Sequence, residues 1–406
     1  MDPSTTLFTL ALGLTPPWKV WNIRFSPEDH RLDITIDFQP GSLFTCPVCG
    51  SNGAKAYDAT DKTWRHLNFF QHEAWLTARV PRVECDKGCG IKKIEVPWAR
   101  HGSGFTLLFE ALIMVMVREM PVAQVAKLLA EQDPRLWRIV RIHVAEAMKH
   151  LDLSGVERIG MDETASRRGH HYISLFFDMD KSQLLFATKG KDKETVKAFA
   201  EDLTTRKGKP KSILQVCCDM SPAFISGVKE QFPNAEITFD RFHIMKIVNE
   251  AVDQVRREEA RTQPLLTKTR FIWLKNPKNL TVKQATTLDS LKDRNLKTAK
   301  AYQIRLTLQE LFQTTNREEG EAFLKRWYFW ATHSRLPPMA AAAKTIKNHW
   351  DGVLNWFHSR LTTGLVEGFN SLLQAAKARA RGYRSNANFI TMAYLIGGKL
   401  NFALPT

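Results

Sequence analysis

Hydrophobic and polar side chains alternate along much of the first hundred residues, which is the pattern of half-buried strands. The clearest case is residues 32–38, Leu-Asp-Ile-Thr-Ile-Asp-Phe, where every second side chain is apolar. Over residues 104–151 the period changes, and apolar side chains such as Val122, Val125 and Leu129 recur three or four positions apart. That spacing predicts helices. We therefore expect a β-rich region of short strands followed by a small all-α region.

Residues 156–244 contain short apolar runs separated by polar turns, which predicts strands with helices between them. The strands are expected at residues 156–161, 171–177, 183–188, 213–218 and 235–239, and the helices at 193–206 and 222–231. The order of three strands, helix, strand, helix and strand is that of the ribonuclease-H-like fold, an α/β arrangement around a mixed five-stranded sheet. It places Asp162 and Asp219 each at the end of a strand.

Residues 245–360 have the period of helices, with Val248, Val252 and Val255 on one face. A last helix is expected to follow, with Glu367 near its start. Four basic residues lie further along this stretch, namely Lys377, Arg379, Arg381 and Arg384. The pattern thus predicts a helical domain inserted before the last part of the α/β core.

Four of the six cysteines form two short pairs in the β-rich region, Cys46 with Cys49 and Cys85 with Cys89. A glycine follows each pair and permits the backbone angles of a tight turn. Four thiolates at such spacings are typical of a zinc ribbon, and a full set of four leaves no open position, so the zinc would be structural. The second pair has three intervening residues instead of the usual two, and four reduced cysteines without metal are the alternative. The remaining cysteines, Cys217 and Cys218, are expected to be small core residues.

Residues 121–149 have the pattern of a helix, a short turn and a basic helix. Arg135, Arg138 and Arg141 recur at three-residue steps and would form one stripe on the second helix. This is the helix-turn-helix arrangement, whose second helix can enter the major groove of DNA. An ordinary helical connector with a salt-bridged surface is the alternative.

The net charge of the 406-residue chain is +16, and almost all of it lies at the C-terminal end. Residues 245–406 carry 26 basic and 12 acidic side chains, whereas residues 1–155 carry 18 and 17, and residues 156–244 carry 14 and 13. A basic field of this size attracts polyphosphates, which favours nucleic acid as a partner over a merely solvated surface. The apolar run 105–117 is interrupted by Glu110 and is shorter than the roughly 18–20 residues of a membrane helix, and no secretory signal is evident. Membrane and secreted classes are therefore not expected.

Three acids have the settings that phosphodiester chemistry requires. Two hard cations held by carboxylates can stabilise both the attacking and the leaving oxygen. Asp162 and Asp219 follow strands that would be neighbours in the expected sheet, and Glu367 begins the helix after the insertion. Glu163 competes with Asp162, but adjacent residues of a strand point to opposite faces.

At this point the sequence resembles a known family. The motifs are Gly160-Met-Asp-Glu163, Asp219-Met-Ser221, Asp240-Arg-Phe-His243 and Glu367-Gly-Phe-Asn370, behind the four-cysteine ribbon. Together they resemble bacterial insertion-sequence transposases of the ISL3 family over nearly the whole chain. The resemblance implies that Asp162, Asp219 and Glu367 are the three acids of a DDE transposase, which bind two Mg²⁺ (or Mn²⁺) ions. Asp240 and His243 are either accessory to this site or a structural hydrogen-bonding pair.

The resemblance and the pattern together predict five parts. They are a zinc ribbon (1–100) with one zinc, a helix-turn-helix domain (101–152), the first part of the catalytic core (153–244), a helical insertion (245–360), and the last part of the core (361–406) with Glu367 and a basic helix. Tryptophans in or beside the insertion could stack on an extruded base, although core packing is the alternative; they are Trp273, Trp327, Trp330, Trp350 and Trp356.

The expected function is that of a DNA transposase that binds terminal inverted repeats, cuts the strand and transfers it to target DNA. Arg135, Arg138 and Arg141 would read the sequence, and the C-terminal basic residues would hold the backbone. By resemblance, a homodimer or higher oligomer would act in the bacterial cytoplasm, on nucleoid DNA. Two alternatives remain open: a structure-selective nuclease of the same fold, and a DNA-binding regulator without catalysis.

Overall fold

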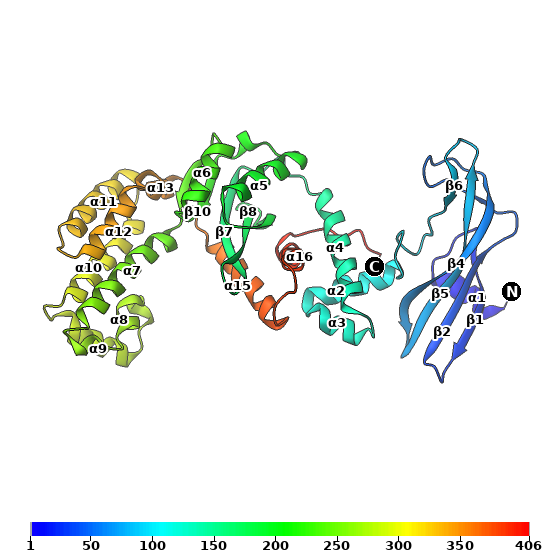
Figure 1. Ribbon diagram of the computed structural model, residues 1–406, viewed down its shortest axis with the longest axis horizontal. Helices are drawn as coiled ribbons and strands as arrows, with labels where there is room; N and C mark the ends of the chain where they lie inside the picture. The colour runs from blue at the N-terminus through cyan, green and yellow to red at the C-terminus, as the bar shows by residue number, and fades with distance from the viewer. Residues whose placement is uncertain (1, 406) are drawn as a thin grey trace. The chain divides into compact units, whose positions relative to one another are not determined.

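A computed structural model describes residues 2–405, which form two compact units (Figure 1). The first unit extends to Ala145 and includes the segment that begins at Asn401, and the second is Glu146–Leu400. Each unit has its own hydrophobic core. Among the described residues, no helix has both the length and the hydrophobicity needed to cross a membrane.

The first unit begins with a six-stranded sheet in the order β1-β2-β5-β4-β3, with β6 beside β5. Its strands are β1 (Trp18–Ser26), β2 (Arg31–Phe38), β3 (Leu43–Phe44), β4 (Ala54–Phe69), β5 (His72–Cys85) and β6 (Gly90–Lys93). The alternation at 32–38 correctly predicted β2, in which every second residue is buried. The expectation of short strands alone was wrong, because β4 and β5 pair along nearly their whole length as one long hairpin.

An N-terminal helix, α1 (Pro3–Ala11), was also not expected from the sequence. The Asp2 side chain caps it by accepting a hydrogen bond from the N–H of Ser4, and Pro3 occupies the first helical position, where its fixed φ suits the helix. Phe8 and Leu12 then pack against the apolar face of the sheet. Tertiary burial therefore stabilises a helix that is too short to persist alone.

Three helices follow the sheet, as the 3.6-residue period predicted. They are α2 (Leu107–Glu119), α3 (Val122–Leu128) and α4 (Asp133–Lys149). Val122 and Val125 of α3 and Leu136 and Val140 of α4 are buried. A four-residue connection joins α3 to α4, so the expected helix, short turn and basic helix are all present.

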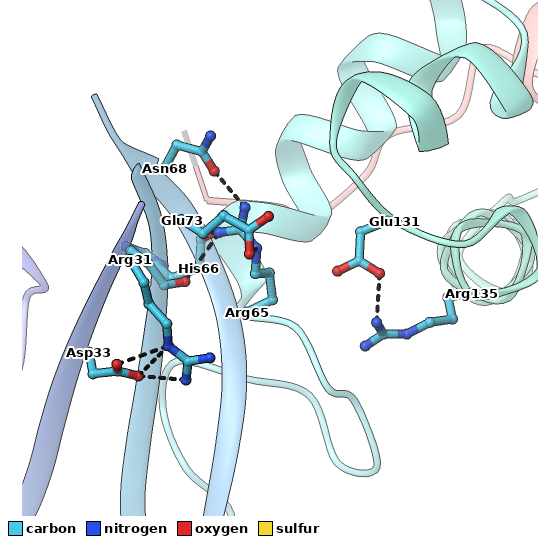
Figure 2. A network of polar contacts seen from close by, with 9 residues as sticks. Arg31, Asp33, Arg65, His66, Asn68, Glu73, Glu131 and Arg135 are labelled. Atoms are coloured by element: carbon cyan, nitrogen blue, oxygen red, sulfur yellow. Dashed lines mark hydrogen bonds and ion pairs between the residues drawn. The ribbon is translucent and has the colours of Figure 1, made fainter. Parts of the chain in front are cut away.

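A buried arginine fastens the sheet to these helices. Arg65 of β4 is 2% exposed and donates hydrogen bonds to the carbonyls of His66 and Ala74 and to Asn68 Oδ1 (Figure 2). Its backbone N–H donates to the carbonyl of Gly104 (2.9 Å), and its guanidinium lies 5.2 Å from the ring centre of Phe109 in α2. Glu73 lies 3.6 Å from Nε. Both the backbone and the side chain of one residue thus hold the two parts together.

The second unit contains a five-stranded mixed sheet in the order β11-β10-β7-β8-β9. The strands are β7 (Arg158–Arg167), β8 (His171–Asp178), β9 (Gln183–Lys189), β10 (Gln215–Cys218) and β11 (Glu236–Phe239), with α5 (Lys193–Thr205) and α6 (Pro222–Gln231) between them. β7, β8 and β9 pair antiparallel, whereas β10 is parallel to both β7 and β11. All five strands and both helices predicted from the sequence are present.

Helices cover both faces of this sheet (Figure 1). On one face, Ile159 and Met161 share a core with Phe199 of α5 and Phe224 of α6. On the other lie α15 (Gly364–Arg379) and α16 (Asn386–Gly397); the Tyr394 hydroxyl of α16 accepts a hydrogen bond from the N–H of Ala187 in β9. Cys217 and Cys218 are fully buried, as predicted for core residues.

The segment between β11 and α15 is helical, as expected. It comprises α7 (Arg241–Glu259), α8 (Arg270–Leu274), α9 (Val282–Lys292), α10 (Lys297–Glu310), α11 (Arg317–Thr332), α12 (Pro337–Lys347), α13 (Trp350–Leu354) and α14 (Trp356–Ser359), with short 3₁₀ turns η2 (Pro264–Leu266), η3 (Pro277–Asn279) and η4 (Leu311–Gln313). Trp273, Trp327 and Trp356 are buried in its core, whereas Trp330 is exposed. Core packing therefore accounts for at least three of the tryptophans.

The basic C-terminal stretch is not one helix, which corrects the expectation. α15 ends at Arg379, and Arg381 and Gly382 have positive φ (+56° and +95°). The N–H of Gly382 then donates to the carbonyl of Lys377, which closes the helix end. Arg381 and Arg384 consequently lie in the connection to α16.

We expect Arg65→Ala to destabilise the first unit by about 2–4 kcal/mol, because it leaves buried acceptors without donors and opens a cavity. Thermal scanning of the full chain should show the lowest transition shifted downward. The control is Arg79→Ala, which removes an exposed arginine paired with Asp37 and should cost less than about 1 kcal/mol. Equal shifts for both variants would contradict the proposed fastening role.

Candidate active site

Asp162 lies in the middle of β7, not at the end of a strand as expected. The reason is that β7 has a different partner on each side. It pairs with β8 as far as Arg167, but with β10 only over its first three residues, 158–160. Asp162 therefore lies just beyond the paired residues of β10. At Asp162, β7 is paired with β8 on one side and is not paired with β10 on the other.

Asp219 and Glu367 are placed as predicted. Asp219 directly follows β10, and one of its carboxylate oxygens accepts a hydrogen bond from the N–H of Ser221 (2.9 Å). Glu367 lies in the first turn of α15. α15 packs on the face of β7 that carries Gly160, Asp162 and Thr164, and Gln374 of α15 donates a hydrogen bond to the Thr164 hydroxyl.

The three acids are close enough to act on one another electrostatically. Asp162 is 9% exposed. Burial raises the pKa of Asp162 to about 6, and the charges of Asp219 and Glu367 also raise it, although the N–H of Glu163 and the charge of His243 act in the opposite direction. A carboxylate held in such a setting is stabilised by a bound cation. Negative charge is therefore concentrated where β10 ends.

Asp240 and His243 border this group of acids. Asp240 is 2% exposed, caps α7 through the N–H of Phe242 (2.8 Å), and accepts a second hydrogen bond from the N–H of Thr363 (2.9 Å). Burial alone would raise the pKa of Asp240, but the nearby His243 ring and hydrogen bonds from Thr363 and Phe242 outweigh burial and lower it. The Thr363 hydroxyl also donates to Glu367 Oε1 (3.2 Å), so Thr363 connects Asp240 to Glu367.

His243 faces several carboxylates. Its Nδ1 lies 3.7 Å from Asp240 Oδ2. The nearby Asp240 carboxylate raises the pKa of His243, and the charges of Asp162 and Asp219 raise it further, whereas burial lowers it. The acids therefore favour the protonated form of His243.

Asn370 closes the motif Glu367-Gly-Phe-Asn370, but the sequence alone gave it no role at the site. Its side-chain N–H donates to Asp162 Oδ2 (2.7 Å), and its Oδ1 is buried without a hydrogen-bond partner among the described residues. Because Asn370 follows Glu367 by three positions, both lie on one face of α15. That spacing is the signal by which the sequence could have identified it.

Glu163 lies on the opposite face of β7 from Asp162, as strand alternation predicted. It is half-buried and lies 4.0 Å from Lys191, which follows β9. Burial raises the pKa of Glu163, the charge of Lys191 opposes this effect, and the charges of Asp219 and His243 also act on it, in opposite directions. Asp162 is consequently the carboxylate of β7 that faces α15.

Cys46, Cys49, Cys85 and Cys89 are brought together at one end of the first unit's sheet. Their sulfur atoms all lie within 4.8 Å of one another, and Sγ of Cys49 is 3.5 Å from Sγ of Cys85. Four sulfurs bound at about 2.3 Å to one zinc ion would be about 3.8 Å apart, so the cluster fits the metal. Within residues 2–405, no other group of three or more His, Cys, Asp or Glu residues is gathered tightly enough to hold an ion, and this includes the three acids.

The backbone around the cysteines also suits thiolates. Gly50, Gly88 and Gly90 have positive φ, which forms the tight turns expected after each pair. The N–H of Lys87 and the Ser51 hydroxyl donate to Cys85 and lower the pKa of this thiol to about 6. Backbone N–H groups of this kind stabilise metal-bound thiolate.

The basic residues expected to contact DNA differ in their solvent exposure and in their contacts within the protein. Arg138 and Arg141 are exposed on α4, but Arg135 pairs with Glu131 (2.6 Å) and stacks on Phe105 (4.2 Å from the ring centre). Near the C-terminus, Lys377 donates to the carbonyl of Ala165 (2.6 Å). The exposed residues there are Arg379, Arg381 and Arg384.

Comparison with known proteins matches three family models to successive parts of the chain. A zinc-finger model of transposases IS204/IS1001/IS1096/IS1165 matches residues 42–89, and a helix-turn-helix model of transposase family ISL3 matches residues 94–144. A DDE transposase model of ISL3 matches residues 159–393, more than half of the chain. The helix-turn-helix match covers all of α2 and α3 and most of α4.

Curated relatives agree over nearly the full length. The transposase for insertion sequence element IS1557 of Mycobacterium tuberculosis is 28% identical, over 96% of this chain and 94% of its own. The transposase for insertion sequence element IS1001 of Bordetella parapertussis is 26% identical, over 89% and 91%. The buried acids, the cysteine cluster and the basic helix thus occur in an enzyme of the DDE class of DNA transposases. Within that class, the chain belongs to the ISL3 family.

We expect metal analysis of the purified protein to find about one zinc per chain. Cys85→Ser should lower the zinc content to near zero and make residues 42–93 sensitive to protease, because zinc binding contributes directly to folding such a site. Cys217→Ala, which removes a buried cysteine of the second unit, is the control and should retain zinc. Retention of zinc in Cys85→Ser would contradict the four-cysteine assignment.

Proposed function

We propose that Asp162, Asp219 and Glu367 are the catalytic triad of a ribonuclease-H-like core and hold two Mg²⁺ or Mn²⁺ ions. The observation that carries the proposal is the burial of Asp162 beside the charges of Asp219 and Glu367, where a strand parallel to β7 ends. The order β9-β8-β7-β10-β11, with only the first three strands antiparallel, supports this fold.

The neighbouring groups are consistent with a cation site. Carboxylate oxygens are the donors that Mg²⁺ and Mn²⁺ prefer. The buried Oδ1 of Asn370 is a further acceptor without a partner among the described residues, and it lies on the side chain that holds Asp162. When bound, two divalent ions supply the charge stabilisation that attacking and leaving oxygens require.

Each protein group then has a defined task. Asn370 orients the Asp162 carboxylate, and Thr363 holds Asp240 and Glu367 at a fixed separation. His243 offsets part of the negative charge when the cations are absent. Asp240, whose two carboxylate oxygens already accept hydrogen bonds from Phe242 and Thr363, supports the site and does not bind the ions.

The DNA substrate would be bound by both units. We propose that residues 1–100 and 101–152 recognise the terminal inverted repeats, that residues 153–244 and 361–406 form the core, and that residues 245–360 are an insertion that holds the strand. A homodimer or higher oligomer would pair two element ends and join them to target DNA in the bacterial cytoplasm.

Asp162→Asn, Asp219→Asn and Glu367→Gln should each reduce cleavage of end-containing DNA by about 10²–10³-fold or more, because each removes charge that stabilises the transition state. Binding to the same DNA should be nearly unchanged. The assay is strand cleavage and strand transfer with Mg²⁺ or Mn²⁺ on DNA that carries the ends of the encoding element.

The matched control is Glu163→Gln, which changes the adjacent acid on the opposite face of β7 and should retain cleavage. Full activity in any of the three triad variants would contradict the proposed site. Cleavage of branched DNA without joining would favour a structure-selective nuclease, and wild-type binding without cleavage would favour a regulator.

Two pairs of exposed arginines should differ in their effect on DNA binding. Arg381→Gln with Arg384→Gln should weaken binding to all duplexes alike and flatten the salt slope by up to about 0.9 per lost contact. Arg138→Gln with Arg141→Gln should instead reduce the preference for the true end by about 1–3 kcal/mol per lost base contact. Salt titrations on specific and random duplexes measure both effects, and the reverse outcome would contradict this division.

A further inference from the structure

A cavity of about 760 Å³ lies beside Glu367 within the second unit. The start of α7, the turn at Asn276–Lys278, the helix α10 and the residues around Gly364 line it. Its volume is in the range of about 300–1,000 Å³ that is typical of sites enclosing one small ligand. It therefore suits a short single-stranded segment of nucleic acid and not a duplex.

Arg305 of α10 lines this cavity and is 3% exposed. Its Nε donates to Asn249 Oδ1, and its Nη2 donates to the carbonyl of Leu274 (2.9 Å). Its Nη1 is buried and has no hydrogen-bond partner among the described residues. Among residues 2–405, no acidic group lies within ion-pair distance of Arg305. The buried Arg256, by contrast, is paired with Asp253 (2.7 Å).

A buried guanidinium with an unpaired N–H group is costly unless an anion is supplied from elsewhere. Two neutral acceptors hold the fork in a fixed direction, and planar N–H donors of this kind match phosphate oxygens. Lys278 and Arg241, both exposed, bring positive charge to a lining that also includes the carboxylates of Asp240, Glu310 and Glu367. Phe242 supplies an exposed apolar wall (57% exposed).

We propose that Arg305 binds a backbone phosphate of the DNA strand whose scissile bond lies at Glu367. Lys278 assists from the rim, and the strand enters the cavity as an unpaired segment. This inference rests on the proposed function of Asp162, Asp219 and Glu367. It assigns to the helical insertion one specific phosphate contact, through Arg305, in addition to the general attraction of its basic residues for DNA.

The test uses full-length protein and end-containing duplexes, each with one neutral methylphosphonate at a single position near the cleavage point, on either strand. In the wild type, a methylphosphonate at one or two positions of the cleaved strand should reduce cleavage by about 10- to 100-fold, as expected for loss of a hydrogen bond to a charged group. Arg305→Gln should cleave unmodified DNA more slowly by a similar factor. It should show no further loss at those same positions.

Arg326→Gln is the matched control, because it removes one exposed positive charge from the insertion outside the cavity. It should keep the wild-type dependence on position. If Arg305→Gln folds and also keeps that dependence, the inference is wrong. If Arg305→Gln does not fold, Lys278→Gln at the exposed rim decides: a weakened dependence at the same positions supports the inference, and an unchanged one overturns it.

The two proposals can fail separately. A wild-type protein that cleaves no end-containing DNA with any divalent cation would overturn the proposed function. An active wild type whose sensitive positions lie on the uncleaved strand, or are absent, would overturn only the phosphate site.

Discussion

The second unit depends on holding the charges of Asp219 and Glu367 within electrostatic reach of the buried Asp162, against their mutual repulsion. Such a group is unfavourable by itself, because burial and like charge both oppose ionisation. The surrounding structure compensates with donors fixed by other elements: Asn370 for Asp162, and the N–H groups of Thr363 and Phe242 for Asp240. The site thus holds an unfavourable electrostatic arrangement that a bound cation would relieve.

The packing of the helical segment against the sheet makes this arrangement possible. One continuous hydrophobic core includes Phe224 of α6, Val248 of α7 and Ile346 of α12. Gly352 of α13 lies against the ring of Phe239, so closely that a Cβ there would be 2.3 Å from a ring carbon. Because Phe239 immediately precedes Asp240, this contact fixes the point from which α7 leaves the sheet. The helical segment therefore supports the acids through this core.

Buried cations complement the buried anions in both units. Both terminal nitrogens of the Arg65 guanidinium donate hydrogen bonds to groups of their own unit, and Arg65 joins the sheet to helix α2. Arg305 differs, because one of its N–H groups has no acceptor among the described residues. A fully satisfied buried cation stabilises the fold, whereas one left partly unsatisfied beside a cavity indicates a ligand.

The sequence alone determined the strands and helices of the α/β core, the zinc cysteines and the setting of Asp219 and Glu367, because local period, turn glycines and metal-ligand spacing are all local signals. It did not determine helix α1, the length of the β4–β5 hairpin or the end of α15 at Arg379. It did not determine that Asp162 lies inside a strand, since that depends on β10 pairing with only three residues of β7. Nor did it identify the roles of Asn370, Thr363 and Arg305. Asn370 and Thr363 bond to Asp162 and Asp240, which are more than a hundred residues away in the sequence. Arg305 bonds to Asn249, which is more than fifty residues away. Only tertiary packing brings such groups within hydrogen-bond distance, so only the folded chain decides which polar groups are satisfied.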